Sequence, residues 1–448
     1  MEIDVLVAEI GSTTTIVNAF NLFGVPLEFI GRGISRTTVE SDVTIGLNDA
    51  IKDLKNNLNI DKLTYKEMHA TSSAAGGLKI TVHGLVYDMT AKAAKEAALN
   101  AGANIHLITA NLIDDDHMDQ IKKVKPNIII IAGGTNYGEK EVSFQNLLKV
   151  KDLNIPIIYS GNIANHNRIK DLDIKDLTIV ENVYPRVDDF NILPLRAAIY
   201  ETFEKHIIKA KGMNKIYDMI TSHIVPTPGA VMETTLILNE LKPGVLTIDV
   251  GGATTDIHSV CEPRTIYQKY HDGEPLFKRT VEGDLGVYIN RELVFNQSNK
   301  KEIYNQLNLD EEDILKLLKN EPFIPQTKEG KILIDMLSET CVSKALDRHV
   351  GDLRRVYTTN GMKVIPDGKD LSEVKNIYLT GGACLNHLSI ENKIGEYLEN
   401  QVHKLIPNKN TPIHKDSLYI FASLGVLSLS YKEKVKAYLK ETYIKGVE

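Results

Sequence analysis

The sequence predicts an α/β protein built from two related halves. A short pattern occurs twice: residues 5–17 read VLVAEIGSTTTIV and residues 245–257 read VLTIDVGGATTDI. In both, an apolar run carries an acid two positions before a glycine and continues into hydroxyl residues. This pattern is typical of a buried strand, a tight glycine turn and a returning strand. Between the two copies, strand candidates alternate with helical patterns, which indicates βαβ units and parallel sheet.

Composition narrows the class of protein. The 448 residues are 43% hydrophobic and 25% charged, as in an ordinary globular protein with large buried cores. A formal net charge of −7 provides no basic excess for nucleic acid. The cysteines Cys261, Cys341 and Cys384 are too far apart for a CxxC site and suit a reducing compartment. The start, MEIDVLV, lacks a basic signal-peptide region, and no apolar run reaches the roughly 18 residues of a membrane span. We therefore expect a cytoplasmic protein with neither a membrane nor a nucleic acid as partner.

The first half contains eight apolar runs of strand length. They lie at residues 5–10, 15–20, 27–31, 67–70, 105–109, 127–131, 155–159 and 177–180. Helical spacing recurs between them at residues 43–54, 118–123, 142–150 and 165–170. The regular alternation after residue 103 predicts a parallel sheet, part of which we expect to be an inserted subdomain.

A helix over residues 195–211 is expected to connect the halves. In the second half, strands are expected at residues 245–250, 258–260, 263–269 and 376–379, and helices at residues 299–319 and 342–349. A second similarity supports duplication: IIIIAGG at residues 128–134 and IYLTGG at residues 377–382 each follow a hairpin at a similar distance.

The second hairpin has the residues that a magnesium-bound polyphosphate needs. Gly251 and Gly252 permit close backbone approach to a phosphate, and the loop continues through Ala253. Thr254 and Thr255 add hydroxyl donors. Asp249, at the strand end, is placed to hold magnesium through water or to orient a water that attacks a phosphate. A simple β-hairpin explains one such copy, whereas two copies favour phosphate binding.

The first hairpin repeats this logic with a longer acid. Glu9 occupies the position of Asp249, followed by Gly11. It either binds magnesium through water or marks a degenerate site, and the residues leave both interpretations open. Ser12, Thr13 and Thr14 are the phosphate-contact candidates here, while Thr15 is also explained as a strand residue.

Other glycine turns supply candidates for the nucleoside edge. Gly381, Gly382 and Ala383 follow a strand, and their small side chains would let an adenine or ribose lie against the backbone. Close strand–helix packing is the alternative explanation, and AGGTNYG at residues 132–138 is the rival candidate. SSAAGG at residues 72–77 is either a small-residue turn, which we favour, or an anion-binding loop or hinge.

Three acidic or thiol features also have structural explanations. Glu282 and Asp284 lie on a glycine turn and are either site acids or an ordinary polar turn. The run at residues 114–116 is expected to be a solvated helix start, and Cys384 a packed small residue. The sequence contains neither an HExxH metal motif nor a GxxxxGK[ST] phosphate loop.

Taken together, EIGSTTT, DVGGATTD and LTGGA resemble the phosphate and adenosine motifs of the actin, sugar kinase and heat-shock chaperone ATPase superfamily. More closely, the chain resembles the MutL (GlmL) family, which is associated with adenosylcobalamin-dependent glutamate mutase and related aminomutases and is unrelated to mismatch repair. Seven stretches carry this likeness: SSAAGGLKI (72–80), AGGTNYGE (132–139), SGNIAN (160–165), VYPRVDDFNILPLRAAI (183–199), TPGAV (227–231), TVEGDLG (280–286) and ALDRHVG (345–351).

The resemblance implies a fold of two ribonuclease-H-like domains hinged over ATP and Mg²⁺. We place the first at residues 1–212, with an α/β insertion around residues 103–184, and the second at residues 213–448. The resemblance also implies an ATPase that acts as a reactivating chaperone for an adenosylcobalamin-dependent mutase or aminomutase and releases damaged cobalamin. The superfamily pattern has Asp where this chain has Glu9. A small-molecule kinase and a non-hydrolysing nucleotide-bound adaptor remain alternatives, and the sequence leaves the oligomeric state open.

Overall fold

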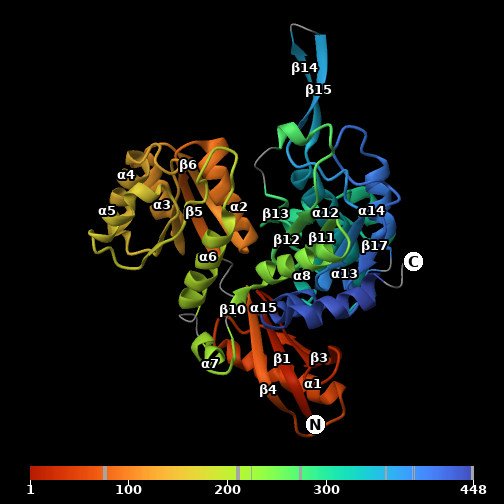
Figure 1. Cartoon of the computed structure of the whole chain (residues 1–448). Helices are drawn as coiled ribbons and strands as arrows, with labels where there is room; N and C mark the ends of the chain where they lie inside the picture. Colours follow the sequence, from red (N-terminus) through yellow and green to blue (C-terminus); the bar gives the residue numbers. More distant parts are fainter. Residues whose placement is uncertain are drawn as a thin grey trace. The chain divides into compact units, whose positions relative to one another are not determined.

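The computed structural model describes residues 1–73, 78–207, 212–222, 224–271, 275–358, 361–385, 387 and 389–444 (Figure 1). The chain divides into two compact units. Unit 1 comprises Met1–Gly11, Thr15–Met232 and Asp272–Lys278, and unit 2 comprises Ser12–Thr14, Glu233–His271 and Arg279–Glu448. The main division falls inside helix α8 (Thr227–Leu241), after the boundary that we place at residue 212 from the sequence.

The first sheet lies mainly in unit 1 and has the strand order β10-β4-β1-β2-β3. Its strands are β1 (Glu2–Ile10), β2 (Thr14–Asn21), β3 (Glu28–Arg36), β4 (Thr64–Ser72) and β10 (Ile224–Pro226). Central β1 pairs antiparallel with β2 and parallel with β4, and it is buried from its second residue onward. A strand with neighbours on both sides and cover on both faces is expected to be mainly apolar, as Val5–Ala8 is.

Helix α1 (Val43–Asn57) follows β3 and buries an apolar stripe. Val43, Leu47, Ala50 and Leu54 are buried at helical spacing, and the side chain of Asp42 caps the helix by accepting from the Thr44 N–H.

The sheet of unit 2 has the same plan. Its order is β13-β12-β11-β16-β17, built from β11 (Val245–Val250), β12 (Thr255–Val260), β13 (Phe277–Glu282), β16 (Asn376–Thr380) and β17 (Ile413–Lys415). Again the first strand is central, its hairpin partner and the third strand lie on one side, and two later strands lie on the other. β11 pairs antiparallel with β12 and parallel with β16. The duplication predicted from the two hairpins is confirmed by this shared strand order.

A third sheet, within unit 1, is the predicted parallel sheet. Its order is β6-β5-β7-β8-β9, and all neighbouring strands in it pair in parallel. The strands are β5 (Leu78–Gly84), β6 (Ala103–Ala110), β7 (Ile128–Ile131), β8 (Ile157–Tyr159) and β9 (Leu177–Ile179). The order 2-1-3-4-5 is that of doubly wound flavodoxin-like sheets. Its helices are α2 (Lys92–Asn100), α3 (Asp115–Val124), α4 (Glu141–Val150) and α5 (His166–Lys170).

Helices supply the remaining cover. Two of them, α6 (Ile192–Ile207) and α7 (Met213–Tyr217), belong to unit 1. Unit 2 contains α9 (Arg291–Gln297), α10 (Lys300–Leu307), α11 (Glu311–Asn320), α12 (Lys328–His349), α13 (Gly382–Leu385), α14 (Ile390–Glu399) and α15 (Phe421–Leu439). The two-stranded hairpin β14 (Asp352–Thr358) and β15 (Gly361–Asp367) projects from the body of unit 2 (Figure 1).

Two expectations are wrong. Residues 263–269 form a turn and the start of a 3-10 helix (Gln268–Tyr270) rather than a strand. The Arg264 N–H donates to Asp370 Oδ2 and the Tyr267 N–H donates to the Arg264 carbonyl, instead of to a neighbouring strand. The IIIIAGG strand, β7, is not the counterpart of the IYLTGG strand, β16, because β7 joins the third sheet whereas β16 lies beside β11. The counterpart of β16 is β4, which pairs in parallel with β1. The predicted SSAAGG turn after Ser73 and the end of the connecting helix after Ile207 lie outside the described residues.

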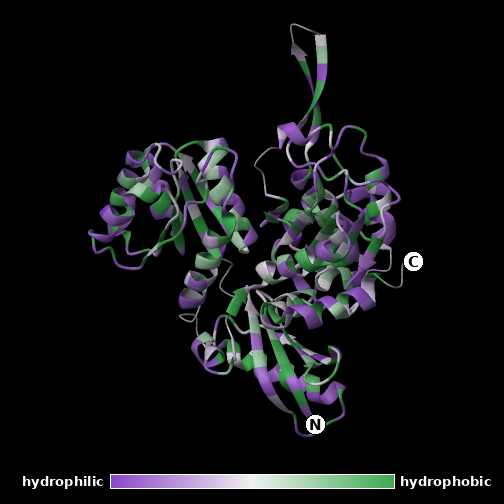
Figure 2. Ribbon diagram, viewed as in Figure 1, coloured by the Kyte–Doolittle hydropathy of each residue, from purple (hydrophilic) through white to green (hydrophobic). Residues whose placement is uncertain are grey.

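The central strands of the sheets are coloured mostly hydrophobic in Figure 2. In unit 1, one buried core contains residues of both the first and the third sheet, and a second core contains residues of the third sheet. Unit 2 has a core of its own. Among the described residues, no helix is both long and apolar enough to cross a membrane.

Candidate functional site

Asp249 lies near the carboxyl end of the central strand of unit 2. In the sheet register it stands opposite Asp256 on β12 and Thr380 on β16. Desolvation by burial raises the pKa of its carboxyl to about 7, with a further rise from the charge of Asp256, while the Arg279 guanidinium acts in the opposite direction. Asp249 keeps some exposed surface. Near neutral pH it can therefore exchange between a proton acceptor and a protonated acid.

Asp256 differs from Asp249 because it has a buried cationic partner. Arg279 Nη2 lies 2.6 Å from Asp256 Oδ1, and both side chains are almost fully buried. The Thr254 hydroxyl donates to the other oxygen, Oδ2, at 3.1 Å. Burial and the Arg279 charge lower the pKa of neighbouring His258 well below its usual value, so this imidazole is neutral. Asp256 is thus paired with a buried cation, whereas burial and the neighbouring carboxylate raise the pKa of Asp249.

The loop between β11 and β12 is held from one side. The carbonyl of Gly251 accepts from the Val287 N–H, and that of Gly252 accepts from the N–H groups of Tyr288 and Ile289. The Asn290 amide donates to the Ala253 carbonyl at 2.9 Å. These bonds fix the loop through its acceptors.

Three backbone donors of the same loop have no acceptor among the described residues. Gly251 N–H closes the turn on the Thr254 carbonyl at 2.9 Å. Within the described part of the chain, the N–H groups of Gly252, Ala253 and Thr254 donate to no protein acceptor. Successive unpaired N–H groups in a fixed turn bind anions, so this loop fits a phosphate group.

Gly381 brings the end of β16 against Asp249. Its φ is +94°, and a Cβ there would lie 2.4 Å from the Val250 carbonyl oxygen and 2.6 Å from Asp249 Oδ1. Only glycine fits this close approach. Gly382 and Ala383 then begin α13. Unit 2 therefore gathers Asp249, the 251–254 loop and the start of α13 at one edge of its sheet.

Two of the predicted hydroxyls have structural roles. The Thr255 hydroxyl is buried and donates to the Leu285 carbonyl at 2.6 Å. Thr15, its counterpart in the first hairpin, is buried 2.9 Å from the Thr37 hydroxyl. These two threonines anchor the second strand of each hairpin, which leaves the preceding residues of each turn as phosphate-contact candidates.

The first hairpin places Glu9 on central β1, opposite Ile16 on β2 and Thr71 on β4. Glu9 is buried, with 6% of its surface exposed. Ser12 and Thr13 are partly exposed beyond Gly11, and the Thr13 and Thr14 hydroxyls lie 3.3 Å apart. The position of Glu9 in its sheet thus matches that of Asp249 in the other sheet.

Asp416 is a residue that sequence reasoning missed. It is buried after β17, accepts from the Thr380 hydroxyl at 2.9 Å, and caps α15 by accepting from the N–H groups of Ile420 and Phe421. It also contributes to the raised pKa of Asp249. No sequence signal marks it, because the contact joins positions far apart in the chain.

The thiols and the described acidic groups point to neither nucleophilic nor zinc chemistry. Burial raises the pKa of the Cys384 thiol, so it stays protonated, and Cys261 and Cys341 are buried as well. Within the described ranges, no group of three or more His, Cys, Asp or Glu side chains could hold a metal ion. Magnesium bound to a nucleotide needs only one or two carboxylates besides phosphate and water, so this finding is compatible with it.

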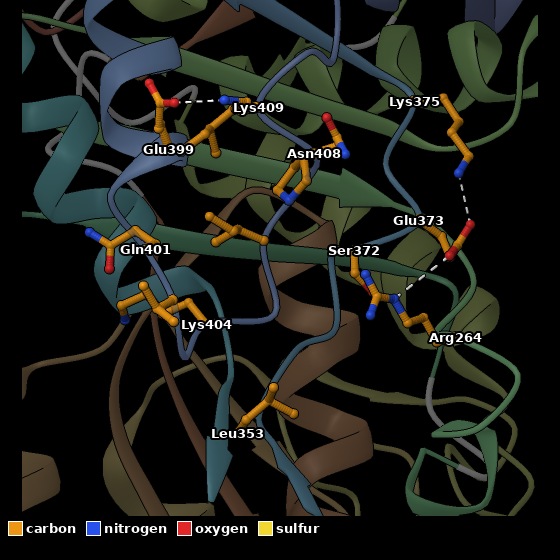
Figure 3. A pocket seen from close by; sticks show the side chains of 14 residues that line it. Arg264, Leu353, Ser372, Glu373, Lys375, Glu399, Gln401, Lys404, Asn408 and Lys409 are labelled. Carbon is orange, nitrogen blue, oxygen red and sulfur yellow. Dashed lines mark hydrogen bonds and ion pairs between the residues drawn. The ribbon is translucent and has the colours of Figure 1, made fainter.

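A pocket of about 540 Å³ lies elsewhere in unit 2, at the base of the β14–β15 hairpin (Figure 3). Its charged groups form ion pairs: Lys409 with Glu399 at 2.6 Å, and Lys375 with Glu373 at 2.8 Å. None of the predicted site residues lines it.

Comparison with known proteins decides the family. A family model described as MutL protein matches residues 5–443. The chain belongs to the MutL protein family. Protein MutL of Clostridium tetanomorphum is 30% identical over 462 residues, covering 98% of this chain and 99% of that protein. The family predicted from the sequence motifs is therefore confirmed. The α/β fold with two related halves agrees with the fold class expected for it.

Several solved structures align with most of this chain at low sequence identity and low TM-score. Acetone carboxylase is 12% identical with a TM-score of 0.41, covering 95% of this chain and 70% of that one. A glycerol dehydratase reactivase is 11% identical with a TM-score of 0.34, covering 94% and 100%. Component A of the Acidaminococcus fermentans (R)-2-hydroxyglutaryl-CoA dehydratase is 10% identical with a TM-score of 0.32, covering 96% and 98%.

Two of the stretches that carry the MutL likeness meet in unit 2. Arg348 of ALDRHVG forms ion pairs with Glu282 and Asp284 of TVEGDLG, with the Asp284 contact at 2.6 Å. His349 bridges the Thr280 hydroxyl at 2.6 Å and the Ser259 hydroxyl at 2.9 Å. Burial raises the pKa of Glu282, whereas the bond from Arg348 lowers that of Asp284. Glu282 and Asp284 thus bind a cation of the chain itself.

Proposed function

We propose that this protein is an ATP-dependent reactivating factor for an adenosylcobalamin-dependent mutase or aminomutase. In this proposal, ATP binding and hydrolysis drive a domain motion that opens the client, so that damaged cobalamin leaves and a fresh molecule enters. Membership of the MutL family supports the type of client. The observation that carries the nucleotide part is the 251–254 loop. Its carbonyls are bonded to the protein, and three of its N–H groups have no acceptor within the part of the chain that the structure describes.

Each hairpin has candidate contacts for the phosphates of ATP. In unit 2, Gly251, Gly252, Ala253 and Thr254 would donate to phosphate oxygens, with Thr255 anchoring the strand behind them. From the first hairpin, Gly11, Ser12, Thr13 and Thr14 would contribute in the same way. The edge formed by Gly381, Gly382 and Ala383 would face the adenosine.

Asp249 is the residue that we assign to hydrolysis. Its carboxylate would hold Mg²⁺ through water or orient the attacking water, and its pKa of about 7 suits a group that accepts a proton near neutral pH. Bound Mg²⁺ would supply positive charge that neutralises the phosphate oxygens. Glu9, at the matching position, is the second candidate for Mg²⁺ through water. Asp256 stays paired with Arg279 and is not assigned a role with the metal.

The test combines nucleotide turnover with recovery of a client. Purified adenosylcobalamin-dependent mutases and aminomutases are inactivated during turnover and then incubated with this protein, ATP, Mg²⁺ and fresh adenosylcobalamin. We expect activity to return for at least one client and only with a hydrolysable nucleotide. If no client recovers although the protein binds ATP, the proposal is wrong.

The same assay separates the alternatives. A kinase would release ADP with a small-molecule acceptor in the absence of any mutase. An adaptor would restore the client equally well when Asp249→Ala has abolished hydrolysis. The three functions therefore give three different patterns of ADP release and recovery.

A further inference from the structure

The third sheet presents exposed apolar side chains at one edge. Because its strands are parallel, their carboxyl ends share that edge. Each of the five loops leaving it carries at least one large apolar side chain that is 42% or more exposed. These are Val86 and Tyr87 after β5, Leu112 after β6, Tyr137 after β7, Ile163 after β8 and Val187 after β9. We call this set the carboxyl-edge surface. Apolar groups gathered in this way are typical of interaction sites.

The loops of this surface are held in place by a buried asparagine. Asn162 is fully buried between the β7 and β8 loops. Its Oδ1 accepts from the Tyr137 N–H at 3.2 Å and the Ala164 N–H at 2.9 Å. Its Nδ2 donates to the carbonyls of Gly138 and Glu139 at 3.1 and 3.0 Å. All four positions of the amide group are therefore used to join two loops.

Further bonds join neighbouring loops of this surface. Asn182, after β9, donates to Asn136 Oδ1 at 3.0 Å, and the Asn136 N–H donates to the Pro185 carbonyl at 3.0 Å. On the other side, the Asn111 N–H donates to the Gly84 carbonyl at 2.9 Å, which connects the loops after β6 and β5. The carboxyl-edge surface is thus preformed, and a partner would have little loop ordering to complete.

Tyr137 is the centre of this surface and contributes little to folding. Its backbone has a φ of +62°, a left-handed conformation that costs a non-glycine residue on the order of 1 kcal/mol. Its side chain is 84% exposed. The buried amide of Asn162 thus holds a tyrosine with a strained backbone and a solvent-exposed side chain. A tyrosine with a purely structural role would be expected to have a buried side chain and an unstrained backbone.

The rim of the surface is acidic. The exposed acids in these loops and the adjoining helix starts are Asp88, Asp114, Asp115, Asp116, Glu139, Glu141, Glu181, Asp188 and Asp189. The exposed bases there are Lys140, Arg168 and Arg186, of which Arg168 pairs with Glu141 at 2.7 Å. An apolar centre with an acidic rim is complementary to a protein face with apolar residues surrounded by lysine or arginine.

We propose that the carboxyl-edge surface is the docking site for the client mutase. This inference rests on the proposed function, which supplies the identity of the partner. Tyr137 and Val187, its two most exposed apolar residues, would enter the centre of the contact, where aromatic residues provide most of the binding energy. The acidic rim would accelerate association with a basic face of the client.

The test uses the full chain and the client that wild-type protein reactivates. Binding of purified client is measured by surface plasmon resonance for wild type, for Tyr137→Ala/Val187→Ala, and for Tyr357→Ala. Tyr357 is the matched control, because it is 82% exposed on β14 of unit 2. Circular dichroism melting confirms that each variant is folded. A further variant, Asp115→Asn/Asp116→Asn, tests the rim.

We expect the double variant to bind the client at least about tenfold more weakly, and Tyr357→Ala to bind as wild type. The rim variant is expected to associate more slowly and with less dependence on salt. If wild type reactivates the client and the double variant binds it unchanged, the docking site is wrong while the proposed function stands. If wild type neither binds nor reactivates any mutase in the panel, the proposed function is wrong. In that case a client mutase is also excluded as the partner that docks on this surface.

Discussion

Replacing Asp249 by asparagine should stabilise unit 2 at alkaline pH while abolishing ATP hydrolysis. In the folded protein the pKa of this carboxyl is raised from 3.8 to about 7, first by desolvation and then by Asp256. At pH values between these two pKa values, the Asp249 carboxyl is protonated in the folded state but has lost its proton in the unfolded chain. The free energy of unfolding therefore falls as pH rises through this window, and the loss is complete above about pH 7.

The size of the effect follows from the shift. A difference of roughly three pKa units corresponds to roughly 4 kcal/mol at most, of which about 2.5 kcal/mol develops between about pH 5 and about pH 8. Because Asp249 keeps some solvent contact, we expect roughly 1–2 kcal/mol of this. For a unit of this size, each kcal/mol moves Tm by roughly 2–4 °C.

Differential scanning calorimetry of both proteins at the two pH values measures this effect. The Tm of the variant minus that of wild type should grow by roughly 2–8 °C from about pH 5 to about pH 8. Asp256→Asn is the matched control. It should destabilise the protein at both pH values, because it removes the carboxylate that pairs with buried Arg279. A Tm difference for Asp249→Asn that does not change with pH, or that shrinks, would refute the reasoning.

Three further predictions concern single side chains. Gly381→Ala should lower the stability of unit 2 by about 1–3 kcal/mol and weaken ATP binding in calorimetric titration, because the φ of Gly381 is +94°. Gly395→Ala in α14 is the control and should be tolerated, because a Cβ at Gly395 would have no atom within 4 Å. Arg348→Ala should lower Tm more than Arg354→Ala does, because its acid partners are less exposed than Asp367; equal shifts would contradict this. The buried thiol of Cys384 should react with a disulfide reagent only as the protein unfolds, and fast labelling of the native state would show it to be accessible.

The sequence predicted the parts of this fold that depend on local patterns. Both hairpins, the alternating strands of the third sheet and the acidic start of α3 could be read from periodicity and capping residues. Asp114 indeed caps α3, accepting from the His117 N–H at 2.8 Å. The repeated acid–glycine spacing predicted the duplication correctly, because it reflects the same strand order in two sheets.

What depends on distant contacts could not be predicted. The similarity of IIIIAGG and IYLTGG was misleading, since strand composition does not say which sheet a strand joins. The roles of Arg279 and Asp416 around Asp249 arise from contacts across the sheet of unit 2. The hairpin at residues 352–367 was missed because its alternating charged and apolar residues are exposed and form no buried stripe.

The release of damaged cobalamin from a client tests the central claim most directly. A mutase loaded with cyanocobalamin is mixed with this protein and Mg²⁺, and the cobalamin that passes through a size-exclusion membrane is measured by absorbance. We predict release only after ATP is added, and at least about tenfold slower release with Asp249→Ala, in line with the loss of a group that acts on the phosphates. No ATP-dependent release from any client, by protein that still binds the nucleotide, would contradict the account.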